Sequence, residues 1–539
     1  MQLQRSIGLV GLTFISISGM IGSGWLFGPY FAAQIAGPAA IVSWALAGFG
    51  MLMIALTYAE IGSMFPVAGG LARLPHFSHG NVVSMFISWA AWLGYVSTAP
   101  LEVQGVLEYA SNEPHLKWLF LDKEAKGGDN QLTPGGVAVA SGLLLLFTVI
   151  NAYGVRLFAT INTYMTWVKL FVPITAAIAL LFLQFEPANM TAHGGFAPAG
   201  LQGVLTAIST GGVIFAFIGF RHAIDLAGEV HNPQVNVPLA LTLAVLACFA
   251  IYVLVQIAFI GALSPDHLKG GWHALNFGHS NGPMAALVAS FGVTWLVILL
   301  YTDAILGPAS SSLVSTASTG RLTMAMSQNG LFPGGLALLS PRGVPLRALA
   351  LNFVVGLLIF MPITSWKQVI TLNTGAIVLS FCMGPLSLYA LRAELPNRPR
   401  AFRIPLAGIV APVAFVLVCW VIYWTGWDTL WRIALPMALG IGLFIVNLAV
   451  DPKLKHTLDI KQALWLVPYF FGLLVLTYLG SFGGGTGLMP FGWDLLIVGL
   501  FGLGIFYLSF RCRLPQEKVH QYLSEEAELE RLEYDEAEN

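Results

Sequence analysis

The sequence is poor in charge: only 9% of its 539 residues are Asp, Glu, Lys or Arg, whereas 57% are hydrophobic. The surface of a soluble globular protein needs far more charge, so this composition excludes that class and predicts a polytopic α-helical membrane protein. The net charge of −1 also lacks the basic excess with which proteins bind phosphate backbones. We therefore expect no nucleic acid as a partner.

Cysteine is scarce as well, because the chain has only Cys248, Cys382, Cys419 and Cys512, with no CxxC spacing. Neither a disulfide framework nor a metal site is expected. No GxxxxGK[ST] phosphate-binding motif occurs, so ATP-driven transport within this chain is not expected, and no cofactor is predicted. No His/Asp/Glu cluster and no Ser/His/Asp set can be assembled at one membrane face, which argues against a membrane-embedded enzyme.

Apolar segments of spanning length are abundant and recur about fourteen times. The first is too long for a signal peptide and lacks a small-residue cleavage site. With the N-terminus placed inside, most Lys and Arg residues of the loops fall on the inner side, as in membrane proteins generally. The sequence therefore predicts a multi-pass protein of the cell (inner or plasma) membrane with both termini in the cytoplasm.

The first apolar segment is interrupted at its centre by four glycines and three serines within residues 16–28 (SISGMIGSGWLFG). Glycine adds backbone freedom and serine hydroxyls compete for backbone hydrogen bonds, so this composition weakens a helix. A helix broken at mid-membrane offers free N–H groups on one half and free C=O groups on the other, which suits a zwitterion such as an amino acid. Alternatively, the small residues only let helices pack closely.

A second interrupted segment follows about two hundred residues later, at residues 209–221 (STGGVIFAFIGFR). Matching interruptions in two halves of a chain are typical of transporters with inverted repeats. The sequence thus predicts a 5+5 inverted-repeat core over residues 1–400, with repeats 5–185 and 200–400. About four additional transmembrane helices over 401–513 and an acidic cytoplasmic tail over 514–539 complete the chain.

Three motifs carry a family resemblance: GMIGSGWLF from Gly19, YAEIGSMFPVAGG from Tyr58, and FIGF from Phe217 followed by EVHNPQ from Glu229. They resemble the motifs of the amino acid–polyamine–organocation permeases in their order along the chain. The likeness covers about residues 5–450 and implies the leucine-transporter-like fold. The extra helices and Trp25, where a small aliphatic residue is usual, are most like the aspartate–proton symporter branch. Arg221 departs from the family pattern, which has an acid there, and Asn329 replaces the usual Asp.

We expect the substrate to bind between the two interruptions. Backbone N–H groups near Gly22, Ser23, Gly24 and Trp25 would bind its α-carboxylate, and carbonyls near Ser18, Gly19, Phe215 and Ile218 its α-ammonium group. Phe215 and Phe217 could close over the substrate, although aromatic residues in a spanning helix often only pack. In the resembled fold the position of Phe215 holds an aromatic gate.

A charge at the bilayer centre costs roughly 2.5–3.5 kcal/mol on insertion scales, so every such residue is a functional candidate. Lys169 could exchange protons; in the resembled permeases a lysine here replaces a coupling sodium ion. Alternatively, it is a structural cation that binds free carbonyls of the first helix. Glu102 and Asp303 are further candidates for proton coupling or for balancing Arg221.

Arg221 and Asp225 are four residues apart, and this spacing predicts a pair within one helix that neutralises both charges. The alternative is that Arg221, next to the second interruption, binds a carboxylate on the substrate's side chain. Glu60 and Glu229 are expected at cytoplasmic helix ends with Arg73 close by, either solvated or in inner ion pairs.

These observations predict a secondary active transporter that takes up an acidic amino acid, aspartate or glutamate, together with protons. The chain is not expected to be an enzyme. An amino acid exchanger or a permease for neutral amino acids is the alternative within the same class, and a membrane enzyme or a channel lies outside it. The expected partners are the amino acid, protons and the lipid bilayer, and the sequence leaves oligomerisation open.

Overall fold

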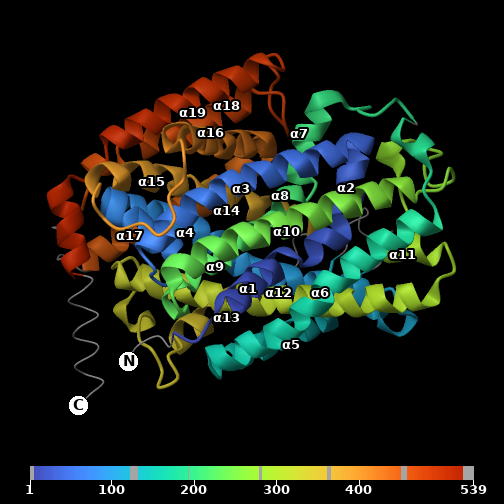
Figure 1. The fold of residues 1–539 in the computed structure, drawn as a ribbon, viewed down its shortest axis with the longest axis horizontal. Coiled ribbons are helices and arrows are strands. Elements are labelled where there is room, and N and C mark those ends of the chain that lie inside the picture. Colours follow the sequence, from blue (N-terminus) through green and yellow to red (C-terminus); the bar gives the residue numbers. More distant parts are fainter. Residues whose placement is uncertain are drawn as a thin grey trace.

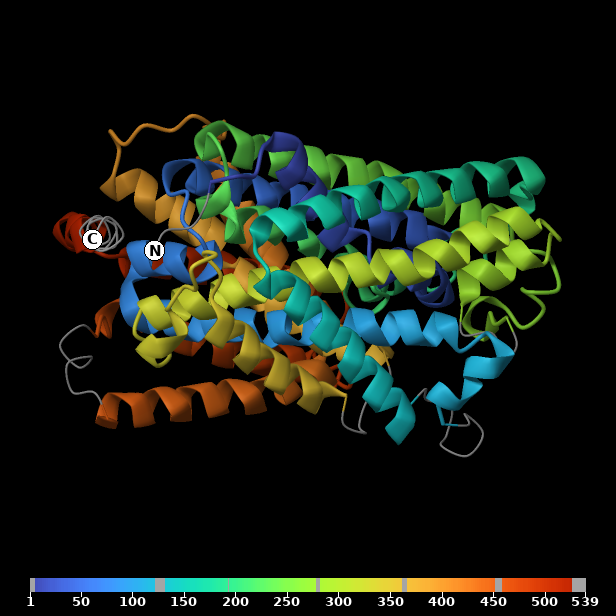
Figure 2. The same cartoon turned by 90° about the horizontal axis from the view of Figure 1, so that it is seen from below.

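A computed structural model describes residues 5–121, 131–191, 193–277, 282–360, 366–450 and 458–525. These residues form a bundle of helices, most of which run along the long axis of the molecule (Figure 1). Viewed from below, both ends of the described chain lie at the same end of the bundle (Figure 2). The expected tail beyond residue 525 lies outside the described residues.

The helices follow one another with short connections. Those of the first half are α1 (Leu9–Met20), α2 (Ser23–Ala36), α3 (Ala40–Met64), α4 (Gly70–Ala110), α5 (Pro134–Ala152), α6 (Val155–Leu183), α7 (Gly200–Thr210), α8 (Val213–Phe217), η5 (Ile218–Arg221), α9 (His222–Asp225) and α10 (Pro233–Gly261). The second half contains α11 (Pro283–Ala289), α12 (Thr294–Gln328), α13 (Leu346–Ile359), α14 (Trp366–Phe381), α15 (Met383–Glu394), α16 (Ala407–Thr425), α17 (Trp427–Val450), α18 (Leu466–Leu479) and α19 (Trp493–Arg511).

The described part of the chain has 11 helices that are long and apolar enough to cross a membrane, or 12 if α7 and the helices after it form one bent span. The longest stretch, Ser23–Met64, contains both α2 and α3. The chain reverses between them at Gly37, which has φ +62°, and Gly28 of α2 packs against Trp44 of α3. Counting these as separate spans and adding the short α13 gives about fourteen crossings, as the sequence predicts.

Two spans are broken near their centres. The first is interrupted between α1 and α2 at Ile21 and Gly22, and the second between α7 and α8 at Gly211 and Gly212, where the axis bends by 48°. Gly212 has φ +82°, a left-handed conformation that favours glycine. Both interruptions therefore fall within the glycine-rich segments.

The long helices α4 and α12 pack along each other through the middle of the bundle, and α1 contacts α6, α10 and α12. Helices α16, α18 and α19 lie together along one edge (Figure 1). This arrangement places the broken spans among longer helices, of which α4 is itself kinked at Gly80, where φ is +81°. The protein is a polytopic all-α membrane protein with the architecture expected of its repeats, and the domain limits given above remain predictions.

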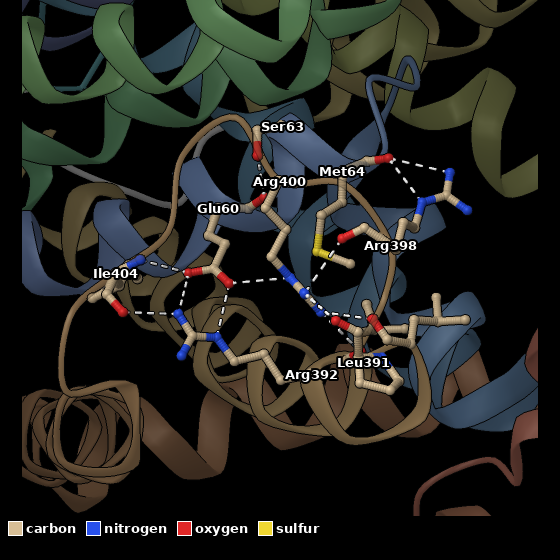
Figure 3. Close-up of polar contacts among 10 residues, drawn as sticks. Glu60, Ser63, Met64, Leu391, Arg392, Arg398, Arg400 and Ile404 are labelled. Atoms are coloured by element: carbon tan, nitrogen blue, oxygen red, sulfur yellow. Dashed lines mark hydrogen bonds and ion pairs between the residues drawn. The ribbon is translucent and has the colours of Figure 1, made fainter.

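Buried ion pairs join helices at the end of the bundle that carries the termini. Arg392 of α15 donates two hydrogen bonds to the buried carboxylate of Glu60, over 2.8 and 2.5 Å. Arg400 lies 3.4 Å from the same carboxylate, and the backbone N–H of Ile404 donates to it over 2.7 Å (Figure 3). The carboxylate of Glu60 thus ties α3 to α15 and to the loop that follows it.

Glu229 is buried in the same way. Its carboxylate accepts hydrogen bonds from Arg321 of α12 over 2.7 and 3.4 Å, while Arg73 binds Asn329 over 2.5 Å. Both carboxylates are therefore in ion pairs rather than solvated, and their partners are arginines other than Arg73. The amide of Asn329 accepts the arginine bond that an aspartate would accept at this position.

We predict that Glu60→Ala lowers the thermal unfolding temperature much more than Glu394→Ala. Removing one partner of a buried pair costs about 3–5 kcal/mol because the remaining charge stays uncompensated. Glu394 pairs with Arg513 at the same end, but its side chain is 14% exposed and that of Arg513 is 28% exposed. A pair that water can reach contributes about 0–1 kcal/mol. Thermal unfolding in detergent measures both variants, and equal shifts would contradict the assigned role of Glu60.

Candidate functional site

The break between α1 and α2 leaves backbone groups without partners inside either helix. Ile21 has φ −82° and ψ +78°, and Gly22 has φ −115° and ψ −139°. These angles are not helical, so the regular hydrogen bonding of α1 stops here: the Ile17 and Met20 carbonyls still accept from the N–H groups of Ile21 and Gly22, but the Ser18 carbonyl and the first N–H groups of α2 need partners from other helices. Water is absent at mid-membrane, so other groups must bind them.

Lys169 binds the end of α1. Its ammonium group comes from the middle of α6 and donates to the Ser18 carbonyl over 2.5 Å and to the Ser18 hydroxyl over 3.1 Å. The Ser18 hydroxyl also lies 2.6 Å from that of Ser310 on α12. A cation at the C-terminus of a helix is favourable for the helix dipole. This is the contact that the interpretation of Lys169 as a structural cation includes, and a lysine in this position could still exchange protons.

Glu102 of α4 binds the beginning of α2. The Ser23 N–H donates to its carboxylate over 2.7 Å, and both residues are buried. A Cβ atom at Gly22 would overlap this carboxylate, which explains why glycine is needed at the break. The carboxylate of Glu102 thus lies at the N-terminus where we expect the α-carboxylate of a substrate.

Trp25 connects α2 to α12. Its indole N–H donates to the carboxylate of Asp303 over 2.9 Å, and both side chains are buried. The second carboxylate oxygen of Asp303 has no hydrogen-bond partner in the part of the chain that the structure describes. The tryptophan therefore supplies a donor for a buried acid, a role that a small aliphatic residue could not have.

The two broken spans touch through their backbones. A Cβ atom at Gly219 would overlap the carbonyl group of Gly19, and one at Gly24 would lie 3.1 Å from Ala216 and 3.3 Å from the ring of Phe215. Phe215 therefore faces the beginning of α2. Phe217 lies elsewhere: its ring packs at 5.1 Å from that of Tyr252 and at 6.0 Å from that of Trp44.

Arg221 is fully buried beside the second break. It donates to the carbonyl of Ile218 over 3.3 Å and to the hydroxyl of Thr98 over 3.2 Å, and it lies 4.0 Å above the ring of Tyr95. Among the described residues it forms no ion pair, and its Nε atom has no hydrogen-bond partner.

The expected pair between Arg221 and Asp225 is not formed as a direct contact. Instead, the hydroxyl of Tyr95 donates to Asp225 over 2.7 Å, while the ring of Tyr95 lies against Arg221. A 3₁₀ helix ends at Arg221 and a short α-helix covers His222–Asp225, so this part of the span is not one regular helix. Tyr95 lies between the two charges and contacts both of them.

Three residues of α4 contact the site: Tyr95, Thr98 and Glu102. Only Glu102 is a candidate from the sequence. Tyr95 and Thr98 precede Glu102 by seven and four residues, so all three lie on the same face of the helix. A row of polar side chains at this spacing in an apolar helix would have identified them from the sequence. His222 was missed too; its ring lies against Gly19 and bonds the hydroxyl of Ser318 over 2.7 Å.

The sequence is similar to known proteins along nearly its whole length. Residues 7–476 match the family model described as "Amino acid permease". The chain belongs to this family. The permease is 36% identical over 509 residues to the glutamate/serine transporter AimA of Bacillus subtilis, an alignment covering 94% of this chain and 93% of the relative. It is 33% identical to the aspartate-proton symporter of the same organism, over 96% and 98% of the two chains. The branched-chain amino acid permease BcaP of B. subtilis is 26% identical over 84% of this chain.

The geometry of this permease gathers most of the predicted site residues around the two breaks. Ser18, Gly19, Gly22, Ser23, Gly24, Phe215, Ile218 and Arg221 line or adjoin them, and Lys169, Glu102 and Asp303 bind groups of the first broken span. Within the described residues no group of His, Cys, Asp and Glu could hold a metal ion. The site therefore offers backbone dipoles and buried charges.

We predict that Gly219→Ala strongly reduces amino acid uptake by this permease. The added methyl group would overlap the carbonyl of Gly19 and force the two broken spans apart. Overpacking costs about 1–3 kcal/mol, which corresponds to about a tenfold to hundredfold loss of affinity if the substrate-bound state bears the strain. Uptake of labelled amino acids into proteoliposomes measures this effect.

The matched control is Gly142→Ala in α5, where an added Cβ would have nothing within 4 Å. It should leave uptake unchanged. Equal uptake by the Gly219→Ala protein would show that the contact between the two breaks has no part in transport.

Proposed function

We propose that this permease is a secondary active transporter that carries an acidic amino acid into the cell together with protons by alternating access. Its family membership and its many spanning helices support transport of an amino acid across a membrane. The further parts of the proposal are that the substrate is acidic, that a proton accompanies it and that transport is inward. They rest on the buried charges around the two breaks.

The backbone groups at the breaks suit the α-carboxylate and the α-ammonium group, which all amino acids share. N–H groups near Ser23, Gly24 and Trp25 would bind the α-carboxylate, since the first N–H groups of a helix form an anion site. Carbonyls near Gly19 and Ile218 would bind the α-ammonium group. The close approach of Gly19 and Gly219 brings these carbonyls to the same place.

Arg221 is the observation that carries the acidic assignment. It is a buried arginine next to the second break that has no ion-pair partner among the described residues. Burying a charge without a partner is costly, whereas a carboxylate matches the planar fork of a guanidinium group. A substrate with a carboxylate on its side chain would supply the partner when it binds.

The names of the first two relatives described above agree with an acidic substrate, since one is a glutamate/serine transporter and the other an aspartate-proton symporter. The serine in the first name is the specific observation in favour of the second candidate, a permease or exchanger for small neutral amino acids. Such a substrate would leave Arg221 with its contacts to Thr98 and Tyr95 only.

Three titratable side chains are the candidates for proton coupling: Lys169, Glu102 and Asp303. Each bonds one part of the first broken span, so a change of protonation would alter the helix that the substrate contacts. We propose that the permease lies in the cell membrane with both termini in the cytoplasm, where the buried ion pairs of Glu60 and Glu229 would close the inner side.

We predict that Arg221→Ala loses uptake of aspartate and glutamate but keeps or gains binding of serine. Truncating one member of a buried charge pair costs about 2–5 kcal/mol, so the affinity for acidic substrates should fall by about one to three decades or more. Retained serine binding serves as the internal control for folding. On the wild-type protein, competition by aspartate, glutamate, asparagine and arginine is the first measurement.

The alternatives give different results. If arginine competes as well as aspartate on the wild-type protein, Arg221 does not bind the substrate and the acidic assignment is wrong. If Arg221 only balances Asp225, then Arg221→Ala should damage folding, and adding Asp225→Asn should restore uptake of acidic substrates.

A further inference from the structure

The two ends of the first broken span are both occupied by side chains of the protein. The carboxylate of Glu102 accepts from the Ser23 N–H over 2.7 Å, and the ammonium group of Lys169 donates to the Ser18 carbonyl over 2.5 Å. All four residues are buried. Together the two side chains place a carboxylate and an ammonium group on the dipoles where an amino acid would place its own.

The carboxylate position leaves no room for a second anion. Even one added carbon atom at Gly22 would overlap the Glu102 carboxylate, so this group lies in direct contact with the backbone of the break. Ser311 of α12 also interacts with the same carboxylate, which places it between α2, α4 and α12. A substrate carboxylate that binds the Ser23 N–H must therefore take the place of Glu102.

We infer that Glu102 is a resident ligand of the substrate-carboxylate site, and that it must accept a proton and leave the Ser23 N–H before the substrate can bind. This inference rests on the proposed function. It goes further by assigning the proton to one residue and by making proton binding and substrate binding one event.

The charge balance supports this order. An ionised Glu102 that left the Ser23 N–H would be an unpaired charge in the protein interior, at a cost of several kcal/mol. One proton from the entry side forms the O–H bond of the neutral Glu102, and the substrate carboxylate replaces the lost negative charge at the N-terminus of α2. The negative charge at the N-terminus of α2 is thus kept, and one proton enters with each substrate. Because aspartate and glutamate carry one net negative charge, their binding with one proton adds no net charge to the site.

The other charged and titratable groups around Glu102 have different contacts. Lys169 from α6 faces it across the break but binds the end of α1. Asp303 from α12 binds the indole of Trp25, not the backbone, and Tyr252 from α10 donates to the carbonyl of Ala216. His222 of α9 bonds Ser318. A substrate carboxylate at the Ser23 N–H would displace none of these groups, only Glu102.

The test measures binding and proton uptake of the purified full-length protein with labelled aspartate, glutamate and serine. For the wild-type protein we expect the affinity to fall by about tenfold per pH unit at alkaline pH, because one proton must bind with the substrate. A pH-indicator dye in weakly buffered solution should report close to one proton taken up per bound amino acid.

Glu102→Gln should bind with an affinity that does not change with pH and should take up no proton, because an amide neither ionises nor competes as an anion. Exchange of substrate across proteoliposomes should persist, while accumulation driven by a pH gradient should be lost. The matched control is Glu108→Gln on the same helix, which should keep the pH dependence of the wild-type protein.

A measurement on the wild-type protein covers the case in which Glu102→Gln fails to fold. Adding substrate should produce an infrared difference band of a newly protonated carboxyl group. If no such band appears and no proton is taken up although substrate binds, the inference is wrong. It is also wrong if Asp303→Asn or Lys169→Met abolishes the pH dependence and Glu102→Gln keeps it.

The proposed function fails on a different result, which is that the folded wild-type protein binds none of the three amino acids at any pH. A pH-independent affinity for aspartate would leave the transport proposal intact and remove only the role of Glu102.

Discussion

A helix that stops in the middle of a membrane exposes N–H and C=O groups that water cannot reach, and the centre of this protein is arranged around that constraint. The last turn of α1 and the first turn of α2 receive an ammonium group from α6 and a carboxylate from α4. The neighbouring helices are thus joined to the broken span by charges as well as by apolar packing. The long helices α4 and α6 hold these charges at the break.

The same constraint explains why charge is scarce overall but concentrated in two places. One is the break, where charges bind backbone dipoles. The other is the end that carries the termini, where Glu60 and Glu229 hold arginines from distant parts of the chain. Each of these carboxylates is buried, and each would be unfavourable without its partner. The first group of charges belongs to the proposed transport path, and the second joins helices at one end of the bundle.

The sequence predicted the positions of both breaks, because clusters of glycine and serine weaken a helix where they interrupt an apolar segment. It also predicted about fourteen spans and, as one of two interpretations of Lys169, a contact of its ammonium group with carbonyls of α1. It could not predict that Glu102 reaches Ser23, since this bond joins residues 79 positions apart and depends on how α4 packs. It paired Arg221 with Asp225 from their four-residue spacing alone, whereas the structure changes from a 3₁₀ helix to a short α-helix at Arg221 and places Tyr95 of α4 against both side chains. Rules based on residue spacing predict neither local changes of helix type nor contacts between residues far apart in the sequence.

The contact between Gly19 and Gly219 has a consequence for how such a chain can change over generations. The two residues lie 200 positions apart, one in each broken span, and neither can gain a side chain unless the other span moves. An added Cβ atom would overlap the ring of His222 if placed at Gly19, and the backbone of Gly19 if placed at Gly219. The two broken spans can change most of their residues independently of each other. At Gly19 and Gly219, however, glycine has to be kept in both spans together.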